Sequence, residues 1–193
     1  MFHLRLALLI GATLLFSATT AFAGGAYLTE IGTPASVGTA GSGNVTNTFS
    51  ADAAWTNPAG MADLEGDQAL LGFQVLIPTV RFDSEIAESG GSDGGNAGFV
   101  SAIPSTFGTK EVSEDWRLGL AVVAPLGGGA DFGKDFVGRY QATRSVLMGL
   151  SISPALSYKV NEKLSLGAGL SFVNTVLDLD ISINQKTTLN PTA

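Results

Sequence analysis

The sequence predicts an all-β protein: an antiparallel transmembrane β-barrel preceded by a segment that is not part of the barrel wall. Long stretches of the chain alternate apolar residues with small or polar ones, which is the period of a strand with one apolar and one polar face. Of the 193 residues, 14% are charged and 25 are glycine, whereas an ordinary soluble domain has roughly 25% charged residues and about 7% glycine. Short turns and long loops alternate along the chain, as they do in bacterial outer-membrane barrels.

Residues 1–23 are predicted to be a cleaved signal peptide. Arg5 supplies a positive charge, an apolar stretch follows from Leu6 to Phe16, and Ala21-Phe22-Ala23 matches the small-x-small pattern of a cleavage site. A transmembrane anchor needs about 20 apolar residues, which is more than this stretch provides. The protein is therefore expected to be exported.

Residues 24–66 are predicted to form an N-terminal segment that differs from the strands that follow. Gly, Ala, Ser, Thr and Asn dominate this segment, and it shows little periodicity. The stretch from Trp55 to Gly60 is rich in turn residues, and Pro58 disfavours the helical conformation at Asn57. Such a segment cannot bury enough apolar surface by itself, so we expect it to lie inside another structure or to pack on one.

Residues 67–193 contain five predicted strands. They cover residues 68–83, 97–110, 116–126, 145–160 and 164–172. The clearest strand, 145–160, would be about 50 Å long at roughly 3.3 Å per residue. Tilted near 45°, it would rise about 35 Å, which exceeds the roughly 25 Å apolar band of an outer-membrane barrel. Beyond Phe172 the apolar residues change phase, which predicts a β-bulge.

The connections between these strands also favour a barrel. Residues 111–115 and 161–163 form short turns, whereas residues 84–96 and 127–143 form long loops. Trp116 and Tyr158 adjoin the short turns, where an aromatic girdle at a membrane interface would lie. A secreted β-sandwich would also show alternation, but the strand length, the low charge and the Gly/Ser-rich polar face favour the barrel.

The composition excludes several kinds of chemistry. The formal charge is −7, and it becomes −8 when Arg5 is removed with the signal peptide, so we expect no nucleic-acid partner. The one histidine, His3, lies in the signal peptide, and the chain has no cysteine. A Ser-His-Asp or Cys-His nucleophile and a zinc site built on His or Cys are therefore excluded. We expect no enzymatic activity, no cofactor and no bound metal, since the loop carboxylates lack the spacing of a calcium loop.

Two stretches resemble the outer-membrane long-chain fatty-acid transporters of the FadL/TodX type. The first runs over residues 25–59 and ends in Asp52-Ala53-Ala54-Trp55-Thr56-Asn57-Pro58-Ala59, and the second covers residues 116–127, 138–140, 154–160 and 164–169. The short motif Asn57-Pro58-Ala59 alone is weak support. The order of these stretches, after a signal peptide and among five alternating strands, makes the resemblance more specific.

The resemblance implies a monomeric barrel of about fourteen strands whose lumen is filled by an N-terminal plug. Residues 24–66 would be that plug, with Asn57, Pro58 and Ala59 as its motif, and this chain would supply the first five strands as part of a longer protein. The implied location is the outer membrane of a Gram-negative bacterium, where the chain would cross several times and contact membrane lipid and lipopolysaccharide.

The resemblance also implies a function: passive uptake of long-chain fatty acids or other hydrophobic compounds, with lateral release through a kinked third strand. Pro125, Gly127, Gly128 and Gly129 are the candidates for that kink, because proline lacks a ladder donor and glycine permits a bend. They could equally end a strand and begin a loop.

Candidate ligand contacts lie in the loop that follows the third strand. Arg139 could bind a fatty-acid carboxylate, or else lipid phosphates or the acidic loop residues. Phe132, Phe136 and Tyr140 could line an apolar surface for the ligand or pack the loop. An aromatic-hydrocarbon channel of the same family and a general diffusion porin are the alternative functions, and the plug-like segment argues against the porin.

Overall fold

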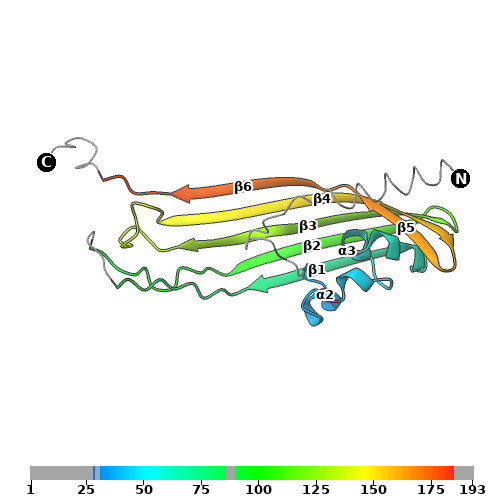
Figure 1. The fold of residues 1–193 in the computed structure, drawn as a ribbon, viewed down its shortest axis with the longest axis horizontal. Coiled ribbons are helices and arrows are strands. Elements are labelled where there is room, and N and C mark those ends of the chain that lie inside the picture. The colour runs from blue at the N-terminus through cyan, green and yellow to red at the C-terminus, as the bar shows by residue number, and fades with distance from the viewer. Residues whose placement is uncertain (1–27, 29–30, 86–89, 185–193) are drawn as a thin grey trace, which may run out of the picture.

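The computed structural model describes Leu28, residues 31–85 and residues 90–184, and it shows one antiparallel sheet with short helices packed on it (Figure 1). The predicted signal peptide lies outside the described residues. The strands are β1 Gln68–Leu76, β2 Ser101–Glu111, β3 Trp116–Asp131, β4 Arg144–Asn161, β5 Leu164–Gly169 and β6 Phe172–Asp180. Their order is β1-β2-β3-β4-β5, and β6 pairs with β4 as well. Consecutive strands are therefore neighbours, with the short turns at one end of the sheet and the long loops at the other.

β5 and β6 are two parts of one strand. The sequence predicted a β-bulge between them, and this prediction was wrong. Gly169 lies opposite Ala155 and Phe172 opposite Ile152, so the residue count is equal on both strands across the break. The break faces Pro154, which has no N–H to donate to the ladder. The Leu170 N–H still donates to the Pro154 carbonyl at 3.0 Å.

The predicted strand limits differ from the observed ones mainly at the long-loop end. β1 ends at Leu76 instead of residue 83, whereas β3 continues to Asp131 instead of residue 126. Glycine-rich residues that we expected to open the long loop are thus part of β3. Their lack of side chains hid them from a pattern based on alternating hydrophobicity.

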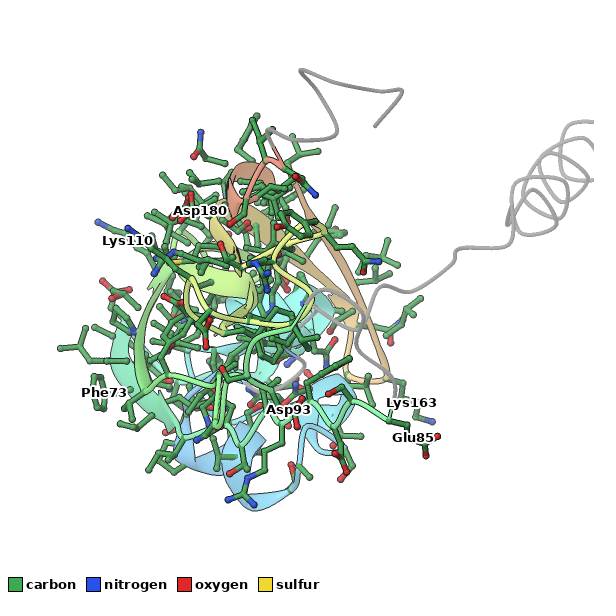
Figure 2. All side chains as sticks on the ribbon, turned by 90° about the vertical axis from the view of Figure 1, so that its left-hand side faces the viewer. Phe73, Glu85, Asp93, Lys110, Lys163 and Asp180 are labelled. Atoms are coloured by element: carbon green, nitrogen blue, oxygen red, sulfur yellow. The ribbon has the colours of Figure 1, made fainter. Side chains whose placement is uncertain are left out.

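The two faces of the sheet differ in chemistry. We call the face that carries the N-terminal segment the inner face and the opposite one the outer face. The outer face presents exposed apolar side chains, among them Phe73, Leu120, Leu150 and Ile152. Figure 2 shows the sheet curving and the Phe73 side chain pointing away from it. The inner face under the N-terminal segment carries mainly small or polar residues such as buried Ser151, which matches the predicted alternation, with Phe107 and Val123 as buried apolar exceptions.

Within the N-terminal segment, whose described part is Leu28 and residues 31–66, residues 31–66 cover the inner face near the short-turn end (Figure 1). It contains α2 Pro34–Gly38, η1 Asn44–Thr46, α3 Ala53–Thr56 and η2 Pro58–Asp63. One buried cluster joins Ala53, Ala54, Met61 and Leu64 to Ala155 of β4, and a second joins Ile31 and Ala51 to Phe107, Ala121 and Val123. None of the helices among the described residues is both long and apolar enough to cross a membrane.

Glycines of the inner face allow the N-terminal segment to approach the strands closely. A Cβ atom added at Gly119 would lie 2.5 Å from Met61 Sδ, and one added at Gly167 would lie 2.5 Å from the Pro58 carbonyl carbon. Both distances are below any real Cβ contact. The small residues that the sequence shows on this face therefore make room for the segment that packs there.

Candidate functional site: a gap between β2 and β3

β3 contains a bulge at Pro125. Val123 lies opposite Ser151, but Leu126 lies opposite Gly149, so β3 has one more residue than β4 in this interval. Proline cannot donate to a ladder, and a bulge is one of the few places in a sheet that tolerates it. The structure thus places the irregularity of the third strand at the residue that the sequence singled out.

Pairing between β2 and β3 stops just before this bulge. Thr106 opposite Val122 is the last pair toward the long loops. Beyond it, β2 pairs with β1 and β3 pairs with β4, and no ladder pair joins residues 98–105 to residues 123–130, all of which the structure describes. The segments that contain β2 and β3 are hydrogen-bonded again where the Asp131 N–H donates to the Ala97 carbonyl at 2.9 Å. The wall therefore has a gap that is closed at both ends.

Gly127, Gly128 and Gly129 form the β4-paired side of this gap. They lie opposite Met148, Leu147 and Val146 of β4, respectively. A Cβ atom added at Gly128 would meet nothing within 4 Å, whereas one added at Gly127 would meet Leu28 Cδ1 and one added at Gly129 would meet the Phe99 ring and the Val146 side chain. The sequence proposed these glycines for the kink, and in the structure they pair regularly with β4 just beyond the bulge at Pro125.

A cavity of about 660 Å³ occupies the gap. Its lining comes from both faces of the sheet: Leu76, Ile103 and Leu126 from the inner face, and Ile77, Met148 and Leu150 from the outer face. Apart from Ser101 and Asn174, the lining side chains are apolar or absent. Such a surface suits an apolar ligand, because its affinity derives mainly from apolar area removed from water.

The N-terminal segment touches the edge of this gap. The Leu28 N–H donates to the Pro125 carbonyl at 2.7 Å. A Cβ atom added at Gly127 would lie 3.3 Å from Leu28 Cδ1, so the Leu28 side chain lies beside the first glycine. A movement of this part of the segment would therefore change the surroundings of the bulge.

The inner face is apolar at the level of the gap, beyond the N-terminal segment. Because β5 and β6 keep one register with β4, Val173 shares the inner face with Ser151, and Leu177 shares it with Leu147. Together with Ile103 and Leu126, they give the long-loop half of the inner face an apolar surface. In the short-turn half, the inner face of β3 and β4 carries mainly small or polar residues such as Arg117, Ala155 and Ser157, and Phe107 of β2 is a large apolar exception.

The motif Asn57-Pro58-Ala59 fastens the N-terminal segment to β4 and β5. The Asn57 side chain Nδ2 donates to the Asn47 carbonyl at 3.3 Å, and the Ser157 Oγ donates to the Ala59 carbonyl at 3.4 Å. The Pro58–Ala59 peptide lies directly on Gly167. The motif thus forms a tight turn against the wall and lies apart from the cavity.

A buried carboxylate ties the two halves of the N-terminal segment together. The Asp52 side chain accepts hydrogen bonds from Thr33 Oγ1 and Asn47 Nδ2, both at 2.6 Å, and from Ser50 Oγ. All three donors are neutral, so this is a satisfied polar network that joins the start of α2 to the start of α3. The sequence analysis did not identify it.

Arg117 is a second residue that the sequence analysis missed. It lies on the inner face of β3 and is 6% exposed. Its guanidinium donates to the carbonyls of Leu64 and Gly66, at the end of the N-terminal segment, and forms an ion pair with Glu111 at 3.1 Å. The signal was present, since Arg117 is a charged residue at an inner-face position between Trp116 and Leu118.

The loop candidates for ligand contact come together, but away from the cavity. The Phe132 and Phe136 rings stack with centroids 4.3 Å apart, and both contact the Phe82 ring edge-on. The Arg139 guanidinium lies 4.8 Å from the Tyr140 ring centroid and donates to the carbonyls of Gly90 and Phe136. None of these side chains lines the cavity. The sequence analysis singled out the lining glycines Gly127, Gly128 and Gly129 for the kink, but not the apolar strand residues that make up most of the lining.

Comparisons with known proteins give one consistent result. The family described as "Outer membrane protein transport protein (OMPP1/FadL/TodX)" matches residues 14–191. The Neisseria meningitidis serogroup B protein named "Putative outer membrane protein NMB0088" is 26% identical over 90 residues, which are 44% of this chain and 19% of that protein. The crystal structure of a Pseudomonas aeruginosa FadL homologue superimposes with a TM-score of 0.66 at 24% identity, covering 80% of this chain and 39% of that one. The two structures share their fold, and the chain spans less than half of either relative.

Proposed function

Because this chain belongs to the outer membrane protein transport family (OMPP1/FadL/TodX), we propose that it serves the passive uptake of long-chain fatty acids or other hydrophobic compounds. It is a multi-pass outer-membrane protein with the antiparallel β-barrel fold of a FadL homologue. The proposal adds the cargo and the route: ligand enters from outside, passes a plug and leaves sideways through the wall.

The gap between β2 and β3 is the observation that carries this proposal. An apolar cavity that has lining residues on both faces of the wall gives an apolar molecule a route that avoids water. Burial of an alkyl chain there would contribute roughly 0.8 kcal/mol per methylene group. The apolar inner face at the same level, with Val173 and Leu177, would hold the ligand before it enters the gap.

The N-terminal segment is the proposed plug. Its described part, Leu28 and residues 31–66, packs on the inner face and reaches the bulge through Leu28. Release of the Leu28–Pro125 hydrogen bond would couple a rearrangement of the plug to the opening of the gap. The remaining sequence, 67–193, is proposed to be the first part of a monomeric barrel of about fourteen strands.

Outside the gap, the long loops are proposed to receive the ligand. Phe132, Phe136, Arg139 and Tyr140 would provide an aromatic and cationic first contact at the outer end, where the chain also meets lipopolysaccharide. Transport of this kind needs no catalytic residue, cofactor or metal.

Deleting the gene in its native host and measuring growth on oleate and on an aromatic hydrocarbon tests the uptake itself. Loss of growth on one of them identifies the cargo class, and unchanged uptake of both compounds contradicts the proposal. Ion conductance of the purified protein in planar bilayers that persists with the plug in place would favour the general porin instead.

Deleting Pro125 tests the route. Without Pro125, β3 has as many residues between Val123 and Leu126 as β4 has between the residues opposite them, and the backbone donor that proline lacks is no longer missing. β2 and β3 can then continue their ladder. We expect uptake to fall while the barrel still assembles. Deletion of Lys134, in the loop after β3, is the matched control and should leave uptake unchanged. Normal uptake without Pro125 would exclude the gap as the route.

A further inference from the structure

Lys110 is a charged residue on the outer face of the wall, which otherwise carries mainly apolar side chains. It lies near the end of β2, opposite Leu118 of β3, which is an exposed outer-face residue. Directly opposed residues point to the same side of a sheet, so Lys110 shares that face. Figure 2 shows Lys110 on the same side of the curved sheet as Phe73. A lysine on a lipid-facing surface must reach an anion or water, because a charge in hydrocarbon is costly.

Aromatic residues next to Lys110 mark the boundary between lipid and water. The Trp116 and Tyr158 rings lie with their centroids 4.5 Å apart, and the Val112 N–H donates to the Trp116 carbonyl at 2.9 Å. Such rings lie at the level of the headgroups in outer-membrane barrels, whose short turns are on the periplasmic side. Lys110 is two residues closer to the membrane centre than Val112. Its long side chain can therefore bring the ammonium group to the headgroups of the periplasmic leaflet.

The outer face lacks large side chains beside Lys110 in the direction of the membrane centre. Gly108, the next outer-face residue of β2, lies between Ala69 of β1 and Leu120 of β3. A Cβ atom added at Gly108 would meet nothing within 4 Å, so the surface is open there. An acyl chain can lie on this small strip beside the exposed leucine and gain apolar contact.

Two exposed carboxylates follow Lys110 in the direction away from the membrane. Glu114 and Asp115 belong to the short turn between β2 and β3. Within the part of the chain that the structure describes, neither they nor Lys110 form an ion pair. Arg117 and Lys159, at the same end of the sheet, each pair with a glutamate instead. The hairpin thus presents an unpaired cation near the hydrocarbon and unpaired anions farther out.

We propose that this surface binds a phospholipid with a primary amine in its headgroup, such as phosphatidylethanolamine, in the periplasmic leaflet. The order of groups along the hairpin matches the order in the lipid. The acyl chain lies along Gly108, the phosphate pairs with Lys110, and the ammonium group pairs with Glu114 and Asp115. Phosphatidylglycerol has the same phosphate but no cation, so the turn carboxylates repel it. This contact does not depend on the cargo and goes beyond the proposed uptake function.

The test titrates the native gene product, purified in detergent, with phosphatidylethanolamine or phosphatidylglycerol of identical acyl chains and counts bound lipid by native mass spectrometry. The unmodified protein should bind phosphatidylethanolamine more tightly. Lys110→Gln should weaken this binding about fivefold, the contribution of one lysine near a membrane surface, and Lys110→Arg should retain it. Lys163→Gln removes an exposed lysine from the other short turn. It is the matched control and should leave binding unchanged.

Replacement of both turn carboxylates, Glu114→Gln with Asp115→Asn, tests the choice of headgroup. This variant should bind the two lipids alike, because the phosphate contact remains and the charge that distinguishes them is gone. All the substituted side chains are exposed, so each variant should fold, and a gel-shift assay for the folded barrel checks this.

Three results would overturn the inference. They are equal binding of both lipids by the unmodified protein, tighter binding of phosphatidylglycerol, and equal effects of Lys110→Gln and Lys163→Gln. None of them bears on the uptake function, which is measured with the cargo.

Discussion

Substituting Gly167 by alanine should separate the N-terminal segment from the barrel wall without harming the wall. Gly167 lies in β5, opposite Ser157 of β4, and its inner side faces the Pro58–Ala59 peptide. An added Cβ atom would lie 2.5 Å from the Pro58 carbonyl carbon, and closer still to the Ala59 nitrogen. Both neighbours are backbone atoms, so no side-chain rotation can relieve the overlap.

The size of the effect follows from these distances. Ordinary contact begins at 3.4 Å, so the turn at Pro58 must move by about 1 Å. It would then lose its fit against Met61 and Ala155 in the buried cluster below it. Overpacking of this kind costs about 1–3 kcal/mol. A cost near 2 kcal/mol would raise the fraction of undocked segments by about 30-fold.

The assay is the sensitivity of cells to a bulky hydrophilic antibiotic, with the stability of the purified barrel measured in parallel. We expect increased sensitivity and an unchanged barrel, because the β4–β5 ladder uses backbone groups only. Gly108→Ala is the matched control, since nothing lies within 4 Å of a Cβ atom added at Gly108 in β2. If Gly167→Ala and Gly108→Ala behave alike, the close fit between segment and wall does not hold the segment in place.

Two further substitutions test the anchor and the two faces. Arg117→Gln removes a charged donor from the carbonyls of Leu64 and Gly66 and should destabilise docking of the segment by about 3 kcal/mol. Faster protease cleavage after Asp63 would report this loss. Arg144→Gln, which breaks exposed ion pairs with Asp131 and Asp178, is the control and should leave the cleavage rate unchanged, because exposed ion pairs contribute little. Phe73→Arg places a charge on the outer face and should lower barrel stability in denaturant by about 2–4 kcal/mol. If an arginine introduced in one of the exposed short turns has as large an effect, the outer face does not face lipid.

Much of the wall could be predicted from the sequence because its outer face and the face under the N-terminal segment carry different side chains on alternate residues. The strand predicted over residues 145–160 is observed as β4, Arg144–Asn161. The short turns, predicted over residues 111–115 and 161–163, lie at residues 112–115 and 162–163. The prediction was wrong where that contrast is missing. Gly127, Gly128 and Gly129 have no side chain to show a face, so their membership of β3 became visible only through pairing with β4.

The candidate site could be predicted only in part. Pro125 stands out in a strand because proline removes a donor, and the bulge lies there. The cavity residues do not stand out, because Ile103 and Met148 look like any apolar strand residues until the loss of β2–β3 pairing is known. Contacts between distant parts of the chain, such as Leu28 with Pro125 and Arg117 with Leu64, depend on how the segment docks and leave no periodic pattern.

The change of phase after Phe172 shows most clearly what a sequence pattern leaves open. A bulge would have kept Leu177 and its apolar neighbours on the outer face, whereas a continuous register turns them inward. The register is continuous, so the same residues that looked like a lipid-facing surface form the inner face at the level of the gap. The same choice moves Asn174 outward, into the cavity lining. One register therefore decides which face of β6 carries its apolar residues, and the alternating pattern alone fits either choice.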